Sequence, residues 1–73
     1  MAWKVKVTRQ NVDRMSVVAS SLKKHIARLL ADVETFPLEI NFEGYRVFFE
    51  KPEDVHSFIR YLDEQVANVR AAA

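Results

Sequence analysis

One stretch of the sequence, from Asn11 to Glu34, carries apolar residues at steps that alternate between three and four. Those positions are Val12, Met15, Ala19, Leu22, Ile26, Leu29 and Val33. This spacing places them on one face of an α-helix, and a β-strand cannot produce it. At about 1.5 Å per residue such a helix is roughly 33 Å long, the width of a small domain. The rest of the chain must therefore pack on this apolar face.

The width and the end of this helix are also predicted. Val18 and Leu30 widen the apolar face to what a globular core needs. Such a face is wider than one short hairpin can cover, which favours a second copy of the chain as a partner. Pro37 cannot continue a helix and disfavours helical geometry at Phe36, so we expect the helix to end near Glu34.

Ahead of the helix, the segment from Trp3 to Thr8 alternates apolar and polar residues. Its apolar face holds Trp3, Val5 and Val7, and its polar face holds Lys4, Lys6 and Thr8. The alternation predicts a half-buried first strand. Either Thr8 or Asn11 can then cap the helix through a side-chain oxygen.

The segment from Leu38 to Phe49 predicts an antiparallel hairpin. Glu43-Gly44 forms the two-residue turn, with Gly supplying a positive φ. The expected pairs are Phe42 with Tyr45, Ile40 with Val47 and Leu38 with Phe49, all on one side of the sheet. The other side carries Glu39, Asn41, Arg46 and Phe48. Phe48 is the exception on this polar side: either the N-terminal segment covers it or it contacts another chain.

A second helix follows the hairpin and begins at Lys51-Pro52-Glu53-Asp54. Pro at the first helical position loses no hydrogen bond, and the two acids lie at the positive end of the helix dipole. Its expected apolar face consists of Val55, Phe58, Ile59, Leu62, Val66 and Val69. We expect residues 71–73 to be a frayed tail.

These elements predict one α+β domain over residues 1–73, in the order β-α-β-β-α. Two helices would form a single layer on a two- or three-stranded sheet. The first strand could join either edge of the hairpin: parallel to its first strand through a right-handed crossover, or antiparallel to its second. The chain contains no Cys, so neither disulfides nor a Cys-ligated zinc ion can stabilise it.

Charge is unevenly distributed along the sequence. Up to Arg28 the chain carries seven bases and one acid, a net charge of +6, and from Asp32 onward it carries nine acids and four bases, a net charge of −5. Three interpretations remain open: solvated faces, complementary ends for head-to-tail assembly, or a basic patch for nucleic acid. The helix bases that such a patch would use are Arg14, Lys23, Lys24 and Arg28.

The sequence offers little catalytic chemistry. We expect His25 to be a neutral side chain at the edge of the core, because its basic neighbours disfavour a charged form or a bound metal. His56 and Glu53 form at most half of a metal site. The serines of the first helix have no partnered His and acid, and a single Gly excludes a glycine-rich phosphate loop. We therefore expect no metal, no cofactor and no enzymatic activity.

Membrane and secretion signals are equally weak. No apolar run approaches the roughly 20 residues that a membrane span needs. Lys4 and Lys6 interrupt the only apolar start that a signal peptide could use. We therefore expect a soluble, cytoplasmic protein that does not bind membranes.

The hairpin and second helix resemble one known family. The residues concerned are Glu43-Gly44-Tyr45-Arg46-Val47-Phe48-Phe49, then Asp54-Val55 and Phe58-Ile59-Arg60-Tyr61-Leu62. They resemble the second half of the gpW-type phage head–tail joining proteins, over less than half of the chain. The resemblance implies a helix, hairpin, helix order, a ring between portal and tail, and a location in the virion or the host cytoplasm. The predicted first strand and the longer first helix depart from that family, and no functional residue is carried over.

The predicted function is non-enzymatic protein binding or assembly, with a phage virion connector component as its most specific form. We expect self-association as a dimer or ring, with Trp3, Phe48 and Arg46 at the interface. One alternative is a small phage or mobile-element inhibitor of a host nucleic-acid-handling complex. Another is a direct nucleic-acid binder that uses the basic side of the first helix.

Overall fold

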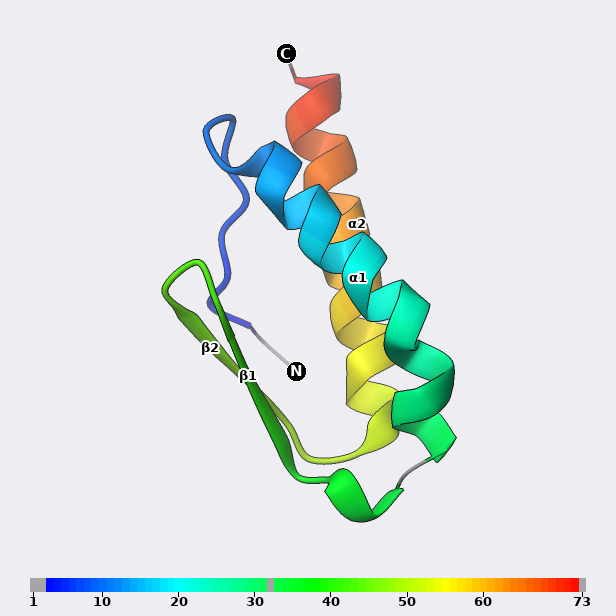
Figure 1. Ribbon diagram of the computed structural model, residues 1–73. Coiled ribbons are helices and arrows are strands. Elements are labelled where there is room, and N and C mark those ends of the chain that lie inside the picture. Colours follow the sequence, from blue (N-terminus) through cyan, green and yellow to red (C-terminus); the bar gives the residue numbers. More distant parts are fainter. Residues whose placement is uncertain (1–2, 32, 73) are drawn as a thin grey trace.

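The computed structural model describes residues 3–31 and 33–72 and consists of two helices and one hairpin (Figure 1). Its elements are α1 (Val12–Ala31), the 3-10 turn η1 (Val33–Thr35), β1 (Leu38–Phe42), β2 (Tyr45–Phe49) and α2 (Pro52–Ala71). The α+β class is confirmed. The two helices run side by side in opposite directions, and the hairpin lies along one side of the pair.

The apolar face of α1 packs as predicted. Met15 and Ala19 are buried, and Val12, Val18, Leu22 and Ile26 are half-buried against the core. The side chains of Leu29, Leu30 and Val33 lie outside the described residues. The α-helix ends at Ala31, earlier than the predicted Glu34, and the chain approaches Pro37 through the tighter turn of η1.

Asn11 precedes α1 but does not cap it. Its Oδ1 accepts a hydrogen bond from the backbone N–H of Thr8 at 2.7 Å, and its Nδ2 donates to the carbonyl oxygen of Lys6 at 3.0 Å. Both polar atoms of the side chain therefore hold the turn that leads into the helix. Neither of the two predicted capping side chains binds the first turn of α1 in the described part of the chain.

The predicted first strand, Trp3–Thr8, does not form, because the sheet contains β1 and β2 alone among the described residues. The alternation itself is correct: Val5 and Val7 are buried, and Lys4 and Lys6 are exposed. Hydrogen bonds from side chains take the place of the backbone hydrogen bonds that a partner strand would make. The Tyr61 hydroxyl donates to the carbonyl oxygen of Val5 at 2.6 Å, so this backbone oxygen needs no partner strand.

The hairpin forms in the predicted register, with Phe42 opposite Tyr45, Ile40 opposite Val47 and Leu38 opposite Phe49. Glu43 and Gly44 both have positive φ, 48° and 81°, as the two-residue turn of a twisted hairpin requires. Val47 and Phe49 are buried. The apolar side of the hairpin therefore faces the helices.

The second helix also follows its prediction. Pro52 is its first residue, and Asp54 is buried, accepting a hydrogen bond from the backbone N–H of Glu50 at 3.1 Å. The buried apolar residues of α2 are Val55, Phe58, Ile59, Leu62 and Val66, with Val69 half-buried. The helix reaches Ala71, and the backbone N–H of Ala72 donates to the carbonyl oxygen of Asn68, so helical geometry continues into the predicted tail. Ala73 lies outside the described residues.

Phe58 lies at the centre of the core. Its ring centroid is 5.3 Å from Trp3, 5.6 Å from Phe49 and 6.0 Å from Phe42. The N-terminal segment, both strands and α2 therefore meet on one aromatic side chain. Such edge and tilted ring pairs add to the free energy gained from area burial alone.

Removing the Tyr61 hydroxyl tests the attachment of the N-terminal segment. Tyr61→Phe should lower the free energy of unfolding by about 1 kcal/mol, because the carbonyl of Val5 loses its partner. Urea denaturation measures the change. Tyr45→Phe is the matched control: its hydroxyl contacts the carbonyl of Lys6 at 3.5 Å in an exposed position, so its effect should be clearly smaller. Equal losses would contradict the assigned anchor.

Candidate functional site

The most distinctive surface feature is an apolar groove between α1 and β1. The two helices pack along each other, and the hairpin contacts α2 through β2. The seam on the other side, between α1 and β1, is therefore less completely filled. Two adjoining hollows of about 350 and 300 Å³ follow it.

Apolar side chains form the floor of this groove. Leu22 and Ile40 line both hollows, so the two are continuous. The remaining apolar lining is Val17, Val18, Leu38, Phe42 and Phe49. All of these except Val17 and Phe49 are half-buried, which leaves part of each side chain open to contact. The groove is therefore a concave apolar surface that remains partly open to solvent.

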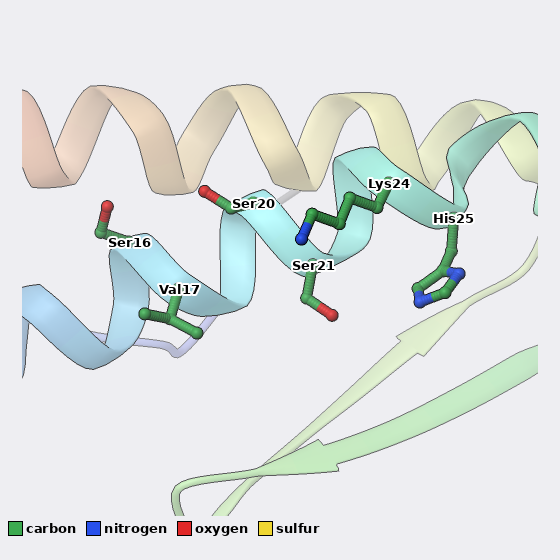
Figure 2. Close-up of a pocket in the computed structure, with 6 residues that line it drawn as sticks. All are labelled: Ser16, Val17, Ser20, Ser21, Lys24 and His25. Carbon is green, nitrogen blue, oxygen red and sulfur yellow. The ribbon is translucent and has the colours of Figure 1, made fainter.

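The exposed flank of α1 borders the groove (Figure 2). Val17, Ser21 and His25 point toward the side of the hairpin, whereas Ser16 and Ser20 lie on the other side of the helix. Val17 is 68% exposed, the largest exposure among the large apolar side chains described. It extends the apolar lining of the groove onto the surface of α1.

The predicted basic patch is divided by ion pairs. Arg14 contacts Glu43 at 3.0 Å, and Lys23 contacts Asp63 at 2.7 Å. Lys24 and Arg28 are exposed and have no ion-pair partner among the described side chains. Both lie beside the groove, Lys24 on the α1 flank and Arg28 in the lining. The free positive charge of α1 therefore borders the apolar groove.

The same pairs show what happens to the charge asymmetry of the sequence. Each of three ion pairs joins the basic first half to the later half: Arg14 with Glu43, Lys23 with Asp63, and Asp13 with Arg70 at 3.4 Å. Because α1 lies beside α2 and the hairpin turn, these pairs offset part of the charge separation along the sequence.

Phe48 and Arg46 lie together on the outer side of the hairpin. Phe48 is 52% exposed, so no described segment fully covers it. It stands opposite Glu39 in the register, and Arg46 binds both carboxylate oxygens of Glu39, at 3.3 and 3.2 Å. This side of β2 therefore presents an exposed aromatic ring beside the ion pair of Arg46 and Glu39.

The third predicted interface residue, Trp3, lies elsewhere. Its ring packs against Phe58 and Tyr61, with centroid distances of 5.3 and 5.7 Å. Its indole Nε1 is buried and has no hydrogen-bond partner among the described residues. Trp3 therefore contributes to the core and is not brought together with Phe48 and Arg46.

The two histidines lie at exposed positions on different helices. His25 is exposed at the edge of the groove, which corrects its predicted place at the edge of the core. His56 is exposed on α2. In the part of the chain that is described, no three His, Cys, Asp or Glu residues form a group that could hold a metal ion.

Neither described helix is long and apolar enough to cross a membrane. Comparisons with protein-family models, curated proteins and solved structures found no match.

The groove was not predicted from the sequence, although its residues were assigned to the core. The available signal was the width of the apolar face on α1, which one hairpin does not cover.

A double-mutant cycle tests whether Lys23 is committed to the fold. Lys23→Ala and Asp63→Ala should show a coupling of about 0.5 kcal/mol in the free energy of unfolding, because both side chains are about half exposed. The coupling should fall with added salt. The matched cycle of Lys24→Ala with Asp63→Ala should show none. Equal coupling in both cycles would contradict a specific pair.

Proposed function

We propose that this chain is a non-enzymatic assembly protein that binds other protein chains, including copies of itself. The observation that carries this proposal is the pair of uncovered apolar surfaces on one small domain: the α1–β1 groove and Phe48. Monomeric proteins expose single apolar residues commonly, but an apolar groove with free bases beside it is a typical interaction surface.

The specific form that we propose is a phage virion connector component, in the virion or the host cytoplasm. Two features support it. The hairpin and α2 carry the residues of the resemblance to gpW-type joining proteins, and the order helix, hairpin, helix is the order that this resemblance implies. The first strand, which departed from that family, is an extended segment instead.

The two alternatives use the same surfaces differently. An inhibitor of a host nucleic-acid-handling complex would bind a foreign protein through the groove or Phe48. A direct nucleic-acid binder needs several free bases along one side of α1. Two of the four candidate bases, Arg14 and Lys23, are already in ion pairs, so we rank this alternative last.

Solution mass is the first test of self-association. Light scattering after size exclusion should give a defined oligomer heavier than the 8.5 kDa chain. Added salt should weaken it, because free charges beside the groove contribute to association. A monomer at every concentration and salt would contradict the self-assembly proposal.

Nucleic-acid binding has its own test. Wild type and the Lys24→Ala, Arg28→Ala double variant should show the same weak affinity for a duplex DNA and a single-stranded RNA, measured by fluorescence anisotropy at several salt concentrations. A salt-dependent affinity that the double variant reduces would instead support the nucleic-acid alternative.

A further inference from the structure

Two exposed apolar side chains lie on different faces of the molecule, Val17 beside the groove and Phe48 on the outer side of β2. The nearby charges that lack an ion-pair partner among the described side chains differ in sign. Lys24 and Arg28 lie beside the groove without ion-pair partners among the described side chains. Glu50 follows Phe48 by two residues, is exposed, and its carboxylate has no partner in the described structure. The two surfaces are therefore complementary in charge.

The two surfaces also differ in form. Phe48 is a half-exposed ring on the outer side of β2, and the groove contains a hollow of about 300 Å³ beside Ile40 and Phe42. Strong interface anchors typically fill desolvated pockets. One surface offers the anchor and the other offers the pocket.

We propose that Phe48 of one copy inserts into the α1–β1 groove of the next copy, with Glu50 reaching Lys24 and Arg28. This inference rests on the proposed self-assembly and assigns its two surfaces. A two-fold pairing of groove with groove would place Lys24 and Arg28 against the same bases of the partner. A two-fold pairing through Phe48 would leave the groove uncovered.

A contact between different surfaces of identical chains is head-to-tail. Each copy then keeps one free groove and one free Phe48, so assembly continues until a ring closes or a filament grows. The charges favour this contact over a pairing of groove with groove, because that pairing brings like charges together. The groove and Phe48 therefore form the two different sides of one interface.

Two single variants and their mixture test the head-to-tail contact. Val17→Glu damages the groove and leaves Phe48 intact, whereas Phe48→Glu damages the anchor and leaves the groove intact. Each should weaken self-association by at least about 30-fold, the loss typical of a strong interface anchor. Light scattering over a range of concentrations measures the loss. Mixed in equal amounts, the two variants should form a dimer and nothing larger, because one intact contact remains per pair.

The controls separate a lost contact from a lost fold. Ala67→Glu adds the same charge at an exposed position of α2 and should assemble like wild type. Circular dichroism and urea denaturation of each variant report folding. A charge exchange gives a second readout: Lys24→Glu with Arg28→Glu should weaken assembly, and Glu50→Lys in the same chain should restore much of it.

Each outcome is decisive. A wild-type monomer would overturn both the proposed function and this inference. An oligomer that persists in folded Val17→Glu and Phe48→Glu would overturn this inference alone. An oligomer lost in one variant and unchanged in the other would show a two-fold interface or a contact with a different surface, and would also overturn it. Loss in both, with a dimer in the mixture, supports the head-to-tail contact.

Discussion

The structure depends on the packing around Phe58. This ring is fully buried and contacts Trp3 of the N-terminal segment, Phe42 of β1 and Phe49 of β2. A two-stranded hairpin is marginal alone in water, and so is an extended segment without a partner strand. The hairpin and the N-terminal segment both persist because they pack against the same aromatic residue of α2. The Tyr61 hydroxyl, one helical turn further on, adds the hydrogen bond that fixes the N-terminal segment.

This arrangement also explains where the surface is incomplete. A chain of 73 residues buries only about 60% of its unfolded surface, so one side of the core is easily left thin. Because the aromatic cluster draws the hairpin toward α2, the thin side falls between α1 and β1. Leu22 and Ile40 are held there half-buried. The groove is thus a consequence of the same packing that stabilises the domain.

Periodicity predicted the parts of the fold that are local. The spacing in α1 and α2 and the alternation from Leu38 to Phe49 determined which residues face the core, including the register around Gly44. The first strand was predicted wrongly because the partners of its backbone are side chains far along the sequence, with Tyr61 56 residues beyond Val5. For the site, the alternation placed Phe48 on the polar side but left open whether the N-terminal segment covers it. The groove could not be predicted in this way, because it depends on the orientation of the hairpin relative to the two helices.

Charge distinguishes the two apolar surfaces of the domain. Part of the asymmetry between the halves of the sequence is offset inside the molecule, since Arg14 and Lys23 pair with acids of the hairpin turn and α2. Among the charges without an ion pair in the described structure, Lys24 and Arg28 lie beside the groove and Glu50 lies near Phe48. In the proposed contact between copies, burial of both surfaces would contribute free energy and link folding to protein concentration. Under that proposal, assembly and stability both follow from the same incompletely covered core.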